Sequence, residues 1–158
     1  MITPEWLEKA VFYNMYPQSF YDSNGDGIGD LNGITEKLNY IKDMGFTAIW
    51  LNPFYESSYR DGGYDVTDFY KVGKRYGANT DFERLCATAH QKGIKICVDL
   101  VAGHTSLECK WFQKSCCAEK NEYTNRYVWT DNWLNIYNGE CIGGYAQRNA
   151  AYMKNFFY

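Results

Sequence analysis

Three short apolar segments alternate with two segments of helical spacing, and this alternation most constrains what the 158-residue chain can fold into. The apolar segments are residues 10–20, 46–53 and 94–101. Each is rich in aromatic or β-branched residues and almost continuously apolar, which is typical of strands buried on both faces of a parallel sheet. The alternation predicts a β-α-β-α-β unit with two right-handed crossovers.

The two segments between the apolar runs have the spacing and the end signals of helices. Residues 33–45 place apolar side chains on one face, and Gly45 follows as the stop. Residues 79–93 also form one apolar face, with Thr80 as the expected N-cap and Gly93 as the stop. We therefore expect one helix between each pair of consecutive strands.

Residues 102–158 differ from the part of the chain before them. They are rich in Asn, Tyr, Trp, Lys and Cys and show no helical or strand period. A helix-free stretch of this length does not fit a simple α/β unit, so it predicts a long insertion or a small irregular subdomain. Three parallel strands with two helices also leave bare sheet edges, which predicts either an unusually small fold or an incomplete chain.

The composition excludes several classes of protein. Apolar residues make up 46% of the chain, which is too many for a disordered protein. The formal net charge of -3 argues against a nucleic-acid-binding face. No apolar run reaches the length of about 18 residues that a membrane span needs, and no signal peptide is visible, so we expect a cytoplasmic protein. The six cysteines form no CxxC pair, and we expect reduced thiols.

An acidic, glycine-rich stretch, DSNGDGIGD, occupies residues 22–30. Its candidate metal ligands are the side chains of Asp22, Asn24, Asp26 and Asp30 and the backbone carbonyl of Ile28. Hard oxygen ligands at this spacing favour a hard cation such as calcium, because carboxylates crowded on one turn repel each other unless a cation lies between them. The stretch is not an EF-hand, since Gly33 stands at the twelfth position and a strand signal precedes the loop. The alternative is a solvated acidic turn with Asx hydrogen bonds.

Two further polar stretches follow the second and third apolar runs. Because α/β sheets place their chemistry at the carboxyl ends of parallel strands, both predict a polar ligand site. The alternatives are a capped turn for the first stretch and a structural histidine for the second. Asp99 lies within an apolar run and must find a partner, since an unpaired buried charge is costly. The candidate residues are Asp61, Tyr64, Asp65 and Asp68 in RDGGYDVTDFY, and Asp99 and His104 in DLVAGHTS.

Taken in order, four stretches of the chain resemble the α-amylase family of glycoside hydrolases (family 13), and within it the oligo-1,6-glucosidase and α-glucosidase branch. The stretches are FYNMYPQSFYDSNGDGIGDLNGI, GFTAIWLNPFYES, GYDVTDFY and DLVAGHTSLECKWF. The resemblance runs from about residue 10 to the end. It implies an α/β fold that is the N-terminal part, about three βα units, of a TIM (β/α)8 barrel. Residues 1–104 would form the barrel part, and residues 105–158 the beginning of the irregular domain B inserted after the third strand.

The same resemblance implies roles for individual residues. Asp61 and Tyr64 match residues that hold, and stack on, the sugar next to the scissile bond, and a tyrosine face suits sugar C–H groups. His104 matches a binder of a sugar hydroxyl, and Asp99 matches a structural carboxylate beneath the site. The stretch at residues 22–30 matches a structural calcium loop.

The resemblance also implies which residues the chain lacks. The family uses a retaining mechanism, whose two main carboxylates lie about 5–5.5 Å apart across the bond. Its nucleophile, acid/base and third carboxylate follow the fourth, fifth and seventh strands, which implies that all three lie beyond Tyr158. No catalytic residue is therefore expected in this chain, and the 158 residues alone are expected to be inactive. Gly103, Cys109 and Lys110 depart from the family pattern, which usually has asparagine at the first position.

The expected function is hydrolysis of α-glucosidic bonds in an α-glucan or α-glucoside oligosaccharide, as part of carbohydrate metabolism. One alternative is a non-catalytic relative that binds sugar or serves as a transporter partner. Another is a transglycosidase or isomerase of the same family. A calcium sensor is disfavoured, because the twelfth ligand of its loop is missing and no second loop pairs with the first.

Overall fold

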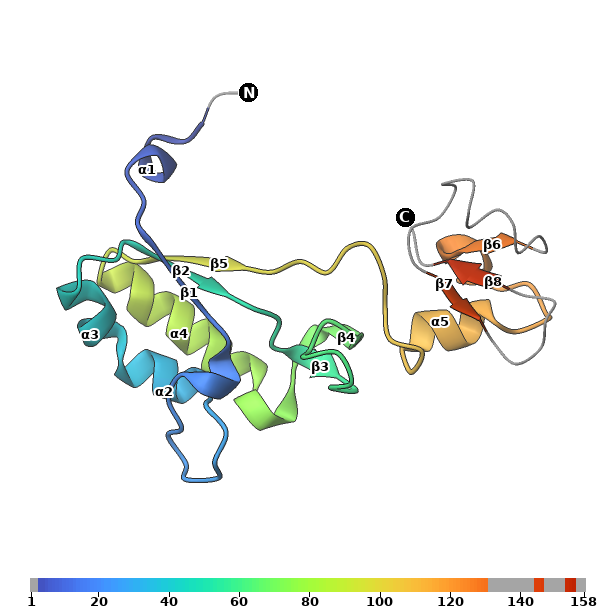
Figure 1. Ribbon diagram of the computed structural model, residues 1–158, viewed down its shortest axis with the longest axis horizontal. Coiled ribbons are helices and arrows are strands. Elements are labelled where there is room, and N and C mark those ends of the chain that lie inside the picture. Colours follow the sequence, from blue (N-terminus) through green and yellow to red (C-terminus); the bar gives the residue numbers. More distant parts are fainter. Residues whose placement is uncertain (1–2, 131–143, 147–152, 156–158) are drawn as a thin grey trace. The chain divides into compact units, whose positions relative to one another are not determined.

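The computed structural model describes residues 3–130, 144–146 and 153–155 of the chain (Figure 1). The chain divides into two compact units. The first consists of Met1–Glu56 and Phe69–Leu100, and the second of Ser57–Asp68 and Val101–Tyr158. Among the residues that the structure describes, no helix is long and apolar enough to cross a membrane.

A parallel three-stranded sheet forms the centre of the first unit. Its strands are β1 (Phe12–Met15), β2 (Ala48–Leu51) and β5 (Lys95–Val98), and β2 lies between the other two. The register places Phe12 beside Ala48, and Ala48 beside Lys95. Consecutive parallel strands need a crossover between them, so the sheet confirms the predicted β-α-β-α-β order.

Three helices of the first unit lie along one side of this sheet (Figure 1). They are α2 (Leu31–Glu36), α3 (Leu38–Asp43) and α4 (Asn79–Gln91), and a short α1 (Glu5–Glu8) precedes β1. The helix predicted over residues 33–45 is two helices that meet at Lys37, where ψ is 5°. Short 3-10 turns, Pro17–Ser19 and Lys74–Tyr76, precede the acidic loop and α4.

The predicted N-cap of the second helix is wrong. The helix α4 begins at Asn79. Its N-cap residue is Ala78, which lies two residues before the predicted cap, Thr80. The carboxylate of Asp81 accepts a hydrogen bond from the backbone N–H of Ala78 at 2.7 Å. An acidic side chain in the first turn therefore provides the hydrogen-bond acceptor for the N-cap backbone N–H, and Thr80 lies inside the helix.

The core of the first unit lies between its sheet and its helices. Side chains with no exposed surface include Leu31, Ile34, Leu38, Ile41, Ile49, Leu51 and Leu85. The prediction that the strands are buried on both faces is wrong for the described part of the chain. Trp50 in β2 is 44% exposed, and Leu100 just after β5 is 72% exposed. The burial of a strand depends on which elements cover each face of its sheet, and the apolar content of the strand alone does not reveal this.

The strands β3 (Tyr55–Ser57) and β4 (Val66–Val72) pair in a two-stranded sheet. The second unit contains α5 (Lys110–Ser115), a 3-10 turn (Thr124–Arg126) and a small antiparallel sheet. In that sheet β8 (Met153–Asn155) lies between β6 (Val128–Thr130) and β7 (Gly144–Ala146). The predicted absence of a helix after residue 102 is wrong, because α5 is present. Six residues are fewer than two turns, too short to show a period.

The second unit has its own small core around α5. Cys109, Phe112 and Tyr127 are buried, and Leu107, Trp111 and Trp129 pack against them. The ring of Phe112 meets that of Tyr127 edge to face, at 5.2 Å between centroids. Cys109 is therefore a core side chain, and Cys86 and Cys97 are half-buried. The boundary predicted at residues 104 and 105, and the start of domain B, stay predictions.

Candidate functional site

The loop that carries Asp61 and Tyr64 is organised by Asp65. This loop, residues 57–65, is called the aspartate loop below. The hydroxyl of Ser57 donates to Asp65 Oδ1 at 2.7 Å. The backbone N–H groups of Arg60 and Asp61 donate to the same carboxylate, at 3.0 and 3.3 Å. One carboxylate therefore joins both ends and the middle of the loop.

The hydrogen bonds to Asp65 decide its charge. Burial raises the pKa of the Asp65 carboxyl, but the bonds from Ser57, Arg60 and Asp61 outweigh burial and hold that pKa below its ordinary value. The carboxyl is therefore ionised at neutral pH, when it accepts hydrogen bonds most strongly.

The backbone of the aspartate loop has an unusual conformation. Tyr59 has φ of 54°, the left-handed region that non-glycine residues rarely adopt. The N–H of Tyr59 donates to Ser57 Oγ at 2.9 Å. A turn follows in which the N–H of Tyr64 donates to the carbonyl of Asp61 at 2.9 Å. This turn leaves the side chain of Asp61 exposed and that of Tyr64 half-buried.

The second candidate loop, residues 101–109, carries His104 and is called the histidine loop. His104 is half-buried, and the next residue, Thr105, is buried. The hydroxyls of Thr105 and Tyr127 are hydrogen-bonded at 2.7 Å. This contact ties the histidine loop to the core around α5, so the backbone next to His104 is held in place.

Three contacts join the aspartate loop and its following strand to the histidine loop within the second unit. The hydroxyls of Ser58 and Ser106 lie 2.9 Å apart, and the guanidinium of Arg60 pairs with Glu108 at 2.6 Å. The N–H of Ser106 donates to the carbonyl of Val66 at 2.9 Å. The structure therefore brings together the loops of Asp61, Tyr64 and His104, through residues that the sequence did not single out.

Asp99, in the first unit, has the partner that its apolar surroundings require. The indole N–H of Trp50 donates to Asp99 Oδ1 at 2.8 Å, and the N–H of Asp99 donates to the carbonyl of Leu51 at 3.0 Å. Burial raises the pKa of the Tyr55 phenol, and the negative charge of Asp99 adds to that shift. A hydrogen-bonded carboxylate just beyond β5 agrees with a structural carboxylate, although its predicted place beneath the site stays a prediction.

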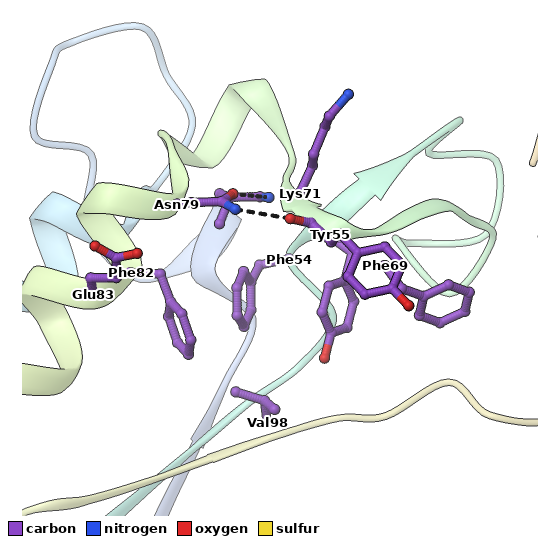
Figure 2. Close-up of a pocket in the computed structure, with 10 residues that line it drawn as sticks. Phe54, Tyr55, Phe69, Lys71, Asn79, Phe82, Glu83 and Val98 are labelled. Carbon is purple, nitrogen blue, oxygen red and sulfur yellow. Dashed lines mark hydrogen bonds between the residues drawn. The ribbon is translucent and has the colours of Figure 1, made fainter.

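A pocket of about 190 Å³ opens in the first unit (Figure 2). Aromatic side chains make up much of its lining: the rings of Phe54 and Tyr55 stack at 5.2 Å, and Phe82 lies 4.9 Å from Phe54. The side chain of Asn79 bridges the backbone of β4, as the dashed lines show (Figure 2). None of the predicted site residues lines this pocket.

The acidic loop, residues 22–30, is folded by its own side chains. Asp22 accepts hydrogen bonds from the N–H groups of Asn24, Gly25 and Gly27, at 3.1, 2.7 and 2.7 Å. The bond from Gly27, with those from Gly25 and Asn24, lowers the pKa of the Asp22 carboxyl. Asp26 accepts from the N–H of Ile28 at 2.8 Å. The turn therefore gathers carboxylate and amide oxygens, the donor type that calcium prefers.

Asp30 has a structural role that the sequence did not reveal. It is only 4% exposed, caps α2 through a 2.7 Å bond from the N–H of Gly33, and accepts from the N–H of Ser23 at 3.0 Å. A Cβ at Gly33 would lie 2.1 Å from the carbonyl oxygen of Tyr21. The backbone therefore approaches too closely for any side chain at the twelfth position of the loop, which explains the missing ligand.

The predicted calcium ligands lie on one turn. Within residues 3–130, 144–146 and 153–155, no group of three or more His, Cys, Asp or Glu side chains is placed to hold a metal ion. The calcium site stays a prediction.

These features together define the class of the protein. A parallel β-α-β-α-β unit with ordered polar loops after its strands is the arrangement of α/β enzymes, which build their sites at the carboxyl ends of parallel strands. Residues 14–157 match the catalytic domain of alpha amylase. The chain belongs to the alpha-amylase family, as the resemblance implied.

Proteins of known activity resemble the chain over nearly its whole length. The oligo-1,6-glucosidase of Heyndrickxia coagulans is 44% identical over 97% of this chain. Maltase A1 of Drosophila melanogaster is 50% identical over 86% of it. The chain spans 29% of the first relative's length and 23% of the second's, or about a quarter.

Solved structures give the same family relationship. The isomaltulose synthase SmuA from Protaminobacter rubrum matches 98% of this chain at 38% identity, with a TM-score of 0.84, and this chain covers 29% of it. A MutB mutant in complex with the substrate sucrose matches 84% of this chain at 45% identity, with a TM-score of 0.78 and 24% of its own length covered. The parallel sheet therefore corresponds to part of the alpha-amylase family barrel.

Proposed function

We propose that the protein to which these residues belong hydrolyses α-glucosidic bonds of short oligosaccharides. The observation that carries the proposal is the 44% identity with an oligo-1,6-glucosidase over 97% of the chain. We further propose that residues 105–158 begin the inserted domain B, and that the 158 residues supply sugar-binding groups while the catalytic carboxylates come from outside them.

Three residues have the proposed sugar-binding roles. Asp61 accepts hydrogen bonds from sugar hydroxyls, the ring of Tyr64 packs on sugar C–H groups, and His104 donates to a hydroxyl. The contacts between the aspartate loop and the histidine loop support this proposal, because they hold the segments of all three residues in one unit. Sugars carry hydroxyls on a rigid ring, so a site that binds them needs donors and acceptors at fixed positions.

A chimeric enzyme tests the proposal. Residues 14–157 of this chain replace the matching segment of the Heyndrickxia coagulans oligo-1,6-glucosidase, and hydrolysis of isomaltose and p-nitrophenyl-α-glucoside is measured. We expect a folded, active chimera. Asp61→Asn and His104→Ala should each lower kcat/KM about tenfold or more, because each loses hydrogen bonds to the sugar. Asp43→Asn, an exposed carboxylate at the end of α3, is the matched control.

A transglycosidase or isomerase is the second candidate, because solved relatives include an isomaltulose synthase and a MutB complex with sucrose. The chimera distinguishes the two activities when it is supplied with sucrose and its products are separated by chromatography. Isomeric disaccharides would favour the second candidate. Sugar binding by the 158-residue chain without turnover in the chimera would instead favour a non-catalytic sugar-binding protein.

A structural calcium ion at the acidic loop is also proposed. Asp22, Asn24, Asp26 and Asp30 would hold it together with the carbonyl of Ile28. The ion would offset the repulsion among the carboxylates and brace the loop before α2.

A further inference from the structure

We propose that Asp65 is a positioning residue, whose carboxylate holds the aspartate loop in the conformation that presents Asp61 and Tyr64. The proposal rests on the sugar-binding function proposed above and deepens it. It concerns a residue that would act through its neighbours and touch no substrate.

Asp65 contacts one sugar-binding candidate, Asp61, and adjoins the other, Tyr64, in the sequence. Its carboxylate accepts from the backbone N–H of Asp61 at 3.3 Å, and Tyr64 is the preceding residue in the chain. The bond from the N–H of Arg60, at 3.0 Å, anchors the residue before Asp61, and the carbonyl of Asp61 accepts from the N–H of Tyr64 at 2.9 Å. The backbone of Asp61 is therefore anchored on both sides, and its N–H bonds directly to the carboxylate of Asp65.

The same carboxylate offsets the strain in the loop. Tyr59 adopts φ of 54°, a strained conformation that persists only where the surroundings over-determine it. Ser57 Oγ accepts from the N–H of Tyr59 at 2.9 Å and donates to Asp65 at 2.7 Å. The strained residue, the serine and the carboxylate form one continuous hydrogen-bonded chain. Removing the carboxylate therefore weakens the hydrogen bonds that hold Tyr59 in this strained conformation.

The ion pair between the two loops is the weaker restraint. The side chains of Arg60 and Glu108 are 71% and 49% exposed, and an ion pair this exposed contributes little to stability. A partly buried carboxylate that accepts several hydrogen bonds contributes more per bond. We therefore assign the conformation of the aspartate loop to Asp65, and the approach of the two loops to the contacts of Ser106 together with the ion pair.

Amide hydrogen exchange in the 158-residue chain tests the structural part of the proposal. In Asp65→Asn, the amides of Arg60 and Asp61 should exchange about tenfold faster or more, because an amide nitrogen replaces one acceptor oxygen. Ser57→Ala should accelerate exchange at Tyr59, whereas Ser57→Thr, which keeps the hydroxyl, should not. Asp43→Asn again serves as the control for removing an exposed carboxylate. If Asp65→Asn fails to fold, as seen by circular dichroism, the two serine variants still decide the test.

Kinetics in the chimera test the functional part. Asp65→Asn should lower kcat/KM about 10- to 100-fold, because a displaced binding group costs this much even when it is chemically intact. The folding midpoint should stay above the assay temperature, and Ser57→Thr should keep near-normal kcat/KM. A purely structural role would lower the yield of folded enzyme and leave kcat/KM per folded molecule unchanged.

The outcomes separate the two proposals. Exchange at Arg60 and Asp61 in Asp65→Asn equal to that in Asp43→Asn would overturn the positioning role, as would an unchanged kcat/KM in an active chimera. A folded, unsubstituted chimera without turnover or sugar binding would overturn the proposed function. In that case the exchange rates alone decide whether Asp65 holds the loop.

Discussion

Single residues in this chain are constrained by what their neighbours leave room for. Gly33 lies against the carbonyl of Tyr21, whereas a Cβ at Gly103 meets nothing within 4 Å. Asp65 and Asp30 each accept several hydrogen bonds and hold a loop by them. Two glycines, or two aspartates, can therefore differ greatly in their importance for folding and for the proposed site.

A pair of glycine substitutions tests this contrast. Gly33→Ala should destabilise the chain by about 3 kcal/mol, because its Cβ would overlap the backbone of Tyr21. Alanine favours a helix over glycine by about 1 kcal/mol, so the loss would report the overlap and not helix propensity. Gly103→Ala should change the free energy of unfolding by about 0.5 kcal/mol or less. Urea denaturation of both variants measures the difference, and similar values for the two would contradict the prediction.

The charge of Asp65 makes a pH-dependent contribution to stability. Its folded pKa lies below the ordinary value of about 3.8, so the contribution is fully present well above pH 3.8 and is lost as the pH falls through the folded pKa. The difference in unfolding free energy between the wild type and Asp65→Asn should be constant near neutral pH and shrink below about pH 4.

Urea denaturation at a series of pH values measures that difference. The lowered pKa of Asp22 affects both proteins alike and cancels in the comparison. A difference that grows on acidification would show the opposite shift and would be inconsistent with the hydrogen bonds to Asp65.

At the scale of elements, the loops after the strands depend on side-chain oxygens to define their shape. The acidic loop folds around Asp22 and is joined to α2 by Asp30. The aspartate loop folds around Asp65, and the histidine loop is tied by Thr105 to Tyr127. Each loop thus has a carboxylate or a buried hydroxyl that replaces the regular bonds of a helix or strand.

The acidic loop should respond to calcium. Calcium should raise the melting temperature of the 158-residue chain relative to excess chelator, because a cation that binds only the folded state shifts the folding equilibrium toward it. Asp22→Asn should reduce this rise, and Asp43→Asn should not. Thermal melting followed by fluorescence measures both variants, with magnesium as the second cation. Equal melting temperatures with calcium and with chelator would rule out the proposed ion.

At the scale of the molecule, the first unit holds the parallel sheet and the acidic loop, and the second holds both sugar-binding candidate loops. The chain spans about a quarter of its relatives' length, and no residue in it was assigned to the nucleophile or the acid/base. We expect the purified 158-residue chain to show no turnover of p-nitrophenyl-α-glucoside while the chimera does. If the purified chain itself shows turnover that persists through further purification, it carries its own catalytic groups.

Much of the fold could be predicted, since local patterns carry it. The three strands and the helix α4 follow from apolar runs and spacing, and the parallel pairing agrees with the predicted β-α-β-α-β order. The break at Lys37, the start of α4 at Asn79 and the helix α5 were missed. Each depends on one or two hydrogen bonds or on a segment too short to show a period.

By itself, the sequence determined the β-α-β-α-β order and the family, because both depend on residue types at fixed spacings along the chain. Only the tertiary structure decided what joins the candidate loops: the contacts of Ser58 with Ser106, and of Arg60 with Glu108, pair residues 48 positions apart. It also decided that Asp65 holds the aspartate loop. Such contacts depend on where folding brings distant backbone together, and residue order alone does not specify that distance.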